Sequence, residues 1–256
     1  MERKIVRIKY HLFSNKGGRE RNEDCAACFV NEAETSGVFI LADGLGGHGN
    51  GEIASELIIA AMTEKFRATE IINEEVILEI MKSANDLLLE AQEQPQYRRM
   101  RSTAVLLYIN EDNVICAHIG DSRLYYFSKE RLQFVTADHS VSYKKFTQGQ
   151  ISYDAIAEDS DRSGLLRVMG NNERFEPEIH NLACSSENRE AFLLCSDGFW
   201  EYIKKDEMLV DLVKSETPEK WTDYMLLRHI ARTDGENDNF SSIAIFIEPT
   251  QNFRKL

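Results

Sequence analysis

Five aspartates stand where predicted strands meet loops: Asp24, Asp43, Asp121, Asp197 and Asp238. Each one alone has a common structural explanation, because Asp-Gly is a frequent hairpin turn and aspartate is a frequent helix N-cap. The five together are harder to explain in this way, since strands packed side by side can bring their ends to one edge. We therefore expect these carboxylates to form a cluster.

Clustered carboxylates stay ionised only when cations balance their charge, and a ligand set made of carboxylates suits Mg²⁺ or Mn²⁺ rather than Zn²⁺. Two such ions about 3.5 to 4 Å apart can share a bridging carboxylate and activate a bridging water for in-line attack on phosphorus. The aspartates thus predict a metal-dependent hydrolase that forms no covalent intermediate.

The strongest local pattern surrounds Asp43. Apolar residues 38–42 run directly into it, a glycine-rich loop follows, and an amphipathic helix begins near Glu52. The loop also spells G-x-G-x-x-G, the dinucleotide fingerprint, at Gly44, Gly46 and Gly49. Against a dinucleotide-binding oxidoreductase, Asp43 would repel a pyrophosphate, and no second strand–helix unit follows. A P-loop is excluded because no Lys-Ser or Lys-Thr follows the glycines.

Regular hydrophobic patterns define the elements that must position the aspartates. Alternating or continuous apolar runs predict strands over residues 6–12, 25–30, 38–42, 103–109, 113–120, 123–128, 131–136, 191–196 and 242–248. Helical spacing predicts one helix burying Ile53, Leu57, Ile58, Ala61 and Phe66, and a second, over about 73–93, burying Ile77, Ile80, Ala84, Leu87 and Ala91. Two more helices are expected over about 206–215 and 218–233. Runs of strands with paired helices indicate a layered α+β fold.

The chain shows no linker, repeat or low-complexity run, so we expect one domain over residues 1–256. The polar stretch 142–164 is the best candidate for a flap beside the cleft, where it would govern substrate choice. With 256 residues and a formal net charge of -13, unassisted binding to nucleic acid or to an anionic membrane is not expected.

The cysteines and the N-terminus indicate the compartment. Five cysteines lie mostly in apolar runs, which suits reduced, buried thiols, and the N-terminus has no signal-peptide pattern. We therefore expect a cytoplasmic protein. Cys25 and Cys28 form a C-A-A-C motif, but strand alternation would point them to opposite faces.

Seven motifs occur in order: RERNED (19–24), LADGLGGHGNGEIAS (41–55), IGDSRLY (119–125), DHS (138–140), LLRVMG (165–170), CSDGFWE (195–201) and DNFSSIAIF (238–246). Together they resemble the motifs of the metal-dependent type 2C (PPM) serine/threonine protein phosphatases, and most closely those of the short stand-alone bacterial members. The resemblance spans about the whole chain. It implies a four-layer αββα sandwich of two antiparallel sheets flanked by helix pairs, with the metals in a cleft at one edge.

The resemblance also implies a role for each matching residue. Asp43 would bridge two Mn²⁺ or Mg²⁺ ions, and the Gly44 carbonyl would bind one of them. Asp197 and Asp238 would hold the first ion.

Glu23 and Asp24 would serve the second ion, directly or through water, and the division between them stays open. Asp121 would contribute with Asp197 to a third metal site. Arg19 matches the arginine that meets the substrate phosphate, where a guanidinium suits two phosphate oxygens.

The chain departs from the family pattern in two places. The glycine usually found three residues before the arginine is Lys16, so Arg19 would be aimed differently and Arg21 or Lys16 could substitute for it. The residue after Gly44 is Leu45, where animal members carry a histidine proposed as general acid. His48, His139 or a metal-bound water could serve as the acid instead, although a structural role is the commoner explanation for either histidine.

The function that this resemblance implies is hydrolysis of phosphoserine and phosphothreonine in proteins, with a cognate serine/threonine kinase and its substrates as partners of a monomeric enzyme. A non-catalytic phosphoprotein-binding or sensor module of the same fold is the alternative. Such a module would be expected to have lost metal carboxylates, and all five aspartates are present.

Overall fold

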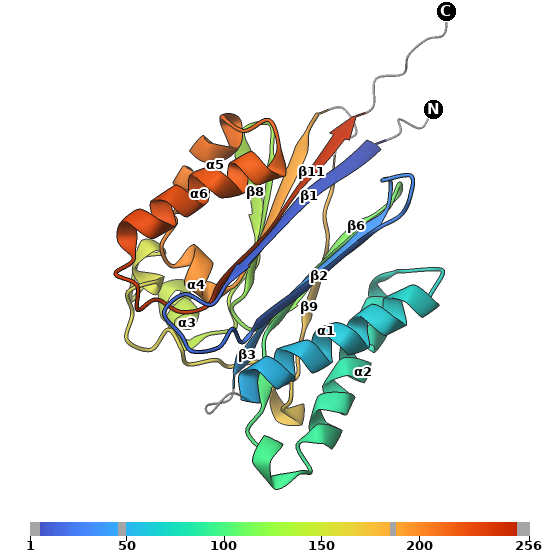
Figure 1. The fold of residues 1–256 in the computed structure, drawn as a ribbon, viewed down its shortest axis with the longest axis vertical. Helices are drawn as coiled ribbons and strands as arrows, with labels where there is room; N and C mark the ends of the chain where they lie inside the picture. Colours follow the sequence, from blue (N-terminus) through green and yellow to red (C-terminus); the bar gives the residue numbers. More distant parts are fainter. Residues whose placement is uncertain (1–5, 46–49, 185–187, 250–256) are drawn as a thin grey trace, which may run out of the picture.

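The chain forms two antiparallel sheets stacked face to face, with helices on both outer faces (Figure 1). The computed structural model describes residues 6–45, 50–184 and 188–249. In the first sheet the strand order is β1 (Val6–Asn15), β11 (Phe240–Pro249), β10 (Glu190–Cys195), β7 (Arg123–Ser128) and β8 (Arg131–Val135). In the second it is β2 (Asp24–Val30), β3 (Gly37–Leu45), β5 (Ala104–Ile109), β6 (Val114–Ile119) and β9 (Glu178–Asn181), with the short β4 (Arg101–Ser102) also paired to β3.

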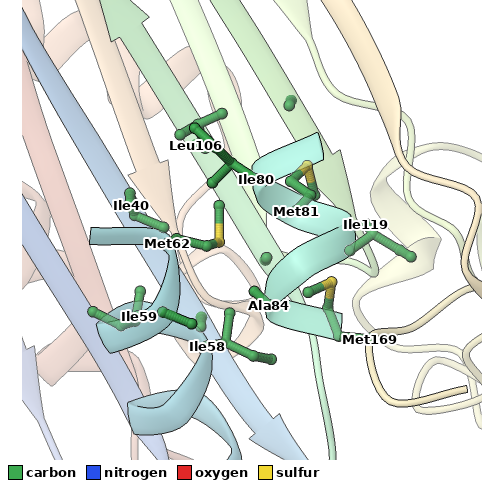
Figure 2. Close-up of a cluster of buried hydrophobic side chains, with 14 of the residues drawn as sticks. Ile40, Ile58, Ile59, Met62, Ile80, Met81, Ala84, Leu106, Ile119 and Met169 are labelled. Atoms are coloured by element: carbon green, nitrogen blue, oxygen red, sulfur yellow. The ribbon is translucent and has the colours of Figure 1, made fainter. Parts of the chain in front are cut away.

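Helices complete the four layers. The second sheet is covered by α1 (Asn50–Ala68) and α2 (Glu74–Ala91), and the first by α4 (Asp197–Trp200), α5 (Lys205–Val213) and α6 (Pro218–Arg232) (Figure 1). Three apolar clusters fill the three spaces between layers. Figure 2 shows the cluster where Ile58 and Met62 of α1 meet Ile40 of β3 and Ala84 of α2. The predicted αββα architecture is confirmed.

The prediction that Ile53 and Leu87 face the core is wrong. Ile53 of α1 is 37% exposed and Leu87 of α2 is 42% exposed. In each helix the next residue, Ala54 or Leu88, is fully buried instead. A helix buries only a stripe of its surface, so a residue at the edge of the apolar pattern can fall outside the contact with the sheet.

The dinucleotide-binding alternative is also wrong. A dinucleotide fold needs a parallel strand after the first helix, whereas β3 pairs antiparallel with both β2 and β5. Residues 46–49, which carry part of the glycine pattern, lie outside the described residues. Cys25 packs toward the helix-side cluster and Cys28 toward the inter-sheet cluster, so they face opposite ways as predicted, and all five cysteines are free.

The predicted flap contains α3 (Val141–Thr147) and the 3₁₀ turn Asp154–Ile156. The Val141 N–H donates to the Gly164 carbonyl at 2.8 Å, so the segment begins and ends at the same point of the fold. Its effect on substrate choice stays a prediction. No helix among the described residues is long and apolar enough to cross a lipid bilayer.

The link between β6 and β7 carries the chain from one sheet to the other. Short links usually join paired neighbours, but these two strands, separated only by residues 120–122, belong to different sheets. Gly120 makes the crossing with a φ of +101°, and a Cβ placed there would lie 2.6 Å from Cγ2 of Thr103. Glycine is required here by both the backbone angle and the space.

We expect Gly120→Ala to lower the free energy of unfolding by about 2–5 kcal/mol, because the methyl group adds a steric clash to the backbone strain. Gly149→Ala is the matched control, since Gly149 also has a positive φ of +70° but nothing within 4 Å of an added Cβ. It should cost only about 1–2 kcal/mol. Urea unfolding measures both, and equal losses would contradict the clash.

Candidate active site

The five predicted aspartates come from both sheets and meet at one end of the sandwich. Asp24 and Asp43 face each other across the β2–β3 pair. Asp197 starts α4 directly after β10, Asp238 stands just before β11, and Asp121 lies in the β6–β7 crossing. Asp43 interacts electrostatically with all four others, and most strongly with Asp197. We call this group the acidic centre.

Burial and mutual repulsion dominate the electrostatics of the acidic centre. Burial, followed by the charge of Asp197, raises the pKa of Asp43 and of Asp121 well above the ordinary 3.8. Burial also raises the pKa of Asp24 to about 7. Burial and the charge of Asp238 raise the pKa of Asp197, whereas a side-chain hydrogen bond with Asp43 lowers it. Burial and repulsion thus outweigh the charges of Arg123 and Arg162, which act on Asp121 and Asp197 in the opposite direction.

The donor atoms fit a hard divalent cation. Ser196 donates to Oδ2 of Asp24 at 2.7 Å, but the buried Oδ1 of Asp24 has no hydrogen-bond partner in the described part of the chain. Asp43 and Asp197 keep part of their surface open to solvent. Oxygen-only ligands, an unpartnered buried oxygen and an uncompensated negative charge are what Mg²⁺ and Mn²⁺ sites provide.

Hydrogen bonds from β4 and the residue after it fix the backbone of Asp43. The Asp43 carbonyl accepts from the Thr103 N–H at 2.9 Å and from the Ser102 hydroxyl at 2.8 Å. The Asp43 N–H donates to the Thr103 hydroxyl at 3.0 Å, and that hydroxyl lies 2.7 Å from the hydroxyl of Ser122. Since Ser122 follows Asp121, the two aspartates are held in one network.

Gly44 is needed for a close approach between β3 and α1. A Cβ on Gly44 would lie 1.9 Å from the Gly51 carbonyl oxygen, and a Cβ on Gly51 would lie 2.8 Å from Oε1 of Glu23. The Gly44 N–H donates to the Glu23 carbonyl at 3.0 Å. These contacts place Glu23 against the first turn of α1, where the Gly51 N–H bonds its carboxylate.

Glu23 and Arg19 adjoin the acidic centre. Burial raises the pKa of Glu23, and the charge of Asp238 adds to that effect. Arg19 forms an ion pair with Asp238 at 2.8 Å while keeping 58% of its side chain exposed. Arg21 instead pairs with Glu52 at 3.2 Å. Arg19, rather than Arg21, thus forms an ion pair with a predicted metal ligand.

The two candidate acids differ in what the structure shows. His48 lies outside the described residues. His139 is buried; its Nδ1 accepts from the Gly120 N–H at 3.2 Å, and its Nε2 lies 3.3 Å from Glu178. Burial, followed by His118, lowers the pKa of His139 to about 4. Nδ1 thus holds the β6–β7 crossing while Nε2 contacts Glu178 of β9 and Arg167, and this engagement of both ring nitrogens favours the structural explanation.

Sequence reasoning gave no role to two residues that the structure places in this region. Asn239 accepts from the Glu23 N–H and donates to the carbonyls of Lys16 and Arg21, each at 2.8 Å, so it fixes the Arg19 loop to β11. Glu201 pairs with Arg162 of the flap at 2.7 Å, and burial raises its pKa to about 7. Asn239 lies in the motif DNFSSIAIF and Glu201 in the motif CSDGFWE. Their place in these motifs is the sequence signal that could have identified them.

Comparisons with known proteins agree with this geometry. Residues 15–234 match the family model described as protein phosphatase 2C. The serine/threonine phosphatase stp of Listeria monocytogenes is 26% identical over 242 residues, 92% of this chain and 94% of the relative. Protein phosphatase PhpP of Streptococcus pneumoniae is 29% identical over 204 residues, 78% and 81% of the two chains.

Solved structures show the same fold. Serine/threonine phosphatase Stp1 from Staphylococcus aureus superposes with a TM-score of 0.85 at 29% identity, covering 94% of this chain and 95% of that one. The catalytic domain of the phosphatase PstP, solved in complex with two manganese ions, gives a TM-score of 0.81 at 23% identity, covering 95% and 99%.

The burial of Asp24, together with repulsion from Asp197 and Asp238, makes a prediction about Asp24→Asn. In chelator, the variant should be more stable than the native protein, by an amount that is near zero at pH 4 and grows to about 1–4 kcal/mol by pH 8. The sign follows because the folded-state pKa of about 7 exceeds the unfolded value of 3.8, so ionising Asp24 costs stability as pH rises. In saturating Mn²⁺ the order of stabilities should reverse.

Urea unfolding at pH 4 and pH 8, with and without Mn²⁺, measures these differences. Asp112→Asn in the exposed β5–β6 turn is the control and should show no dependence on the metal. If Asp24→Asn were less stable than the native protein in chelator at pH 8, uncompensated repulsion could not describe the centre.

Proposed function

The chain belongs to the protein phosphatase 2C family, and from this premise we propose that it hydrolyses phosphoserine and phosphothreonine in proteins with divalent cations held by the acidic centre. The observation that carries the proposal is the convergence of five aspartates at one end of the sandwich, where burial and mutual repulsion raise the pKa of Asp43 and Asp121 despite the charges of Arg123 near Asp121 and Arg162 near Asp197. A binding module would gain nothing from this arrangement, since buried like charges destabilise the fold unless they hold cations.

We assign the ligands as follows. Asp43 would hold both cations and the Gly44 carbonyl would bind one of them. Asp197 and Asp238 would hold the first, and Glu23 and Asp24 would serve the second. Asp121 and Asp197 would contribute to a third site. When bound, Mn²⁺ or Mg²⁺ supplies Lewis acidity that lowers the pKa of water and balances the charge of the phosphoryl oxygens.

The protein's own side chains position the substrate. Arg19 is the group that binds the phosphate, because its exposed guanidinium offers two parallel N–H donors at the edge of the acidic centre. Asn239 supports it by fixing the loop between residues 16 and 23. Phosphoproteins follow as the substrate class, and a serine/threonine kinase that forms these phosphoesters would be the partner of a monomeric enzyme.

A cytoplasmic location is part of the proposal. All five cysteines are free, and unpaired thiols suit a reducing compartment. The treatment of the whole chain as one catalytic domain belongs to the proposal as well.

The central test is turnover of p-nitrophenyl phosphate and of a phosphothreonine peptide. We expect activity with Mn²⁺, none with EDTA, and a loss of at least about 100-fold in kcat for Asp43→Asn, because that change removes the charge shared by two cations. Asp112→Asn, remote from the centre, should retain native turnover. Metal-independent activity, or full activity of Asp43→Asn, would overturn the mechanism.

Arg19 and Arg21 can be separated by alanine substitution. Arg19→Ala should raise KM for the phosphopeptide about 10-fold or more, since a charge-assisted bond to phosphate contributes about 1.5–3 kcal/mol. Arg21→Ala removes only an exposed ion pair with Glu52 and should change KM less than about threefold. Steady-state kinetics measure both; the reverse order would assign the phosphate to Arg21.

A further inference from the structure

A second group of metal-binding side chains lies at the opposite edge of the second sheet from β2. His118 of β6 pairs with Glu178 of the edge strand β9, and Cys116 pairs with His180 two residues further along. Residues paired in this way share a face, and Cys116 belongs to the apolar cluster between the sheets. His118, Glu178 and His180 therefore project into the space between the two sheets, and we call them the histidine cluster.

The hydrogen bonds of His118 leave one nitrogen ready to bind a ligand. Its Nε2 lies 2.9 Å from the Ala137 carbonyl, and because a carbonyl only accepts, Nε2 carries the proton. Nδ1 then has a free lone pair, yet it is buried and has no hydrogen-bond partner among the described residues. His118 itself is 0% exposed. A histidine ligand of a metal commonly donates its other N–H to a backbone carbonyl in this way.

His180 presents a second buried nitrogen without a hydrogen-bond partner in the described chain, its Nε2. This atom lies 3.7 Å from Oε2 of Glu178, too far for a hydrogen bond. The other carboxylate oxygen, Oε1, accepts from Arg167 at 2.7 Å, which fixes the orientation of the carboxylate. One ligand atom from each of the three residues lies within 4.8 Å of the others.

A purely structural role accounts poorly for this arrangement. Two buried nitrogens without partners cost about 1–3 kcal/mol each. Protonating the rings to form ion pairs with Glu178 is opposed at His118, where burial lowers the pKa. A neutral imidazole with one unprotonated nitrogen near a carboxylate and a second imidazole is instead the form that binds a metal.

We propose that His118 Nδ1, His180 Nε2 and the Glu178 carboxylate bind one Zn²⁺ ion, at a site separate from the acidic centre. Two imidazoles and a carboxylate favour a borderline cation such as Zn²⁺, whereas the all-oxygen acidic centre favours Mg²⁺ or Mn²⁺. The Glu178 and His180 side chains are 37% and 34% exposed, so the site is open to solvent on one side. A bound ion would tie the edge strand β9 to β6.

Co²⁺ is the probe, because it replaces Zn²⁺ and has visible ligand-field bands that are far stronger in four-coordinate sites with nitrogen ligands than in six-coordinate oxygen sites. The full-length chain is stripped with chelator and titrated with Co²⁺ while excess Mg²⁺ occupies the acidic centre. We expect one equivalent of Co²⁺ to give the strong bands and one equivalent of Zn²⁺ to abolish them. Zn²⁺ should also raise Tm.

Variants then locate the ion. His180→Gln and Glu178→Gln should each lose the bands and the Zn²⁺-dependent rise in Tm. Asp43→Asn should keep both, which separates this site from the acidic centre and from the proposed phosphatase activity. His11→Gln on β1 is the matched histidine control and should also behave as the native protein.

Both His180 and Glu178 are partly exposed, so their variants are expected to fold, and circular dichroism verifies this. Should one variant fail to fold, the other decides the outcome alone. Absence of strong bands in the native protein, bands that need a large excess of Co²⁺, or bands that persist in a folded His180→Gln or Glu178→Gln variant would each overturn the proposal.

Discussion

The repulsion among buried carboxylates at the end of the sandwich is the constraint on which the rest of the structure depends. Burial raises the pKa of Asp43 most, and the charges of the four other aspartates raise it further. Left to relax, such groups would move apart or take up protons. The backbone hydrogen bonds from Ser102 and Thr103 hold the end of β3 in place against that tendency. The acidic centre thus lowers the stability of the folded protein, and bound cations can restore that stability.

Two stacked sheets can bring more carboxylates to one place than a single sheet can. The second sheet supplies Asp24 and Asp43 from neighbouring strands, and the first supplies Asp197 and Asp238 at the ends of β10 and β11. The apolar cluster between the sheets fixes their separation, because buried residues of both sheets are packed against one another there. Packing far from the acidic centre therefore sets the distance between its two halves.

Much of the fold and most of the centre could be predicted from the sequence because the relevant signals are local. An apolar run that ends in Asp43 or Asp197 identifies both a strand and the residue at its end. Edge strand β9 was not predicted, because its four residues, Glu178–Asn181, are mostly polar and give no clear alternation. The roles of Asn239 and Glu201 were also missed, since each depends on a partner about 40 or more positions away.

The histidine cluster and the acidic centre are separate sites, and His139 links the two. His118 lies three residues before Asp121, and its ring stacks on that of His139 at a centroid distance of 4.6 Å. His139 in turn accepts from the Gly120 N–H, at the crossing that delivers Asp121. The stacked rings therefore support the backbone next to a predicted ligand. Any ion that fixed His118 would stiffen this support, so the position of Asp121 depends on side chains at the opposite edge of the second sheet from Asp24.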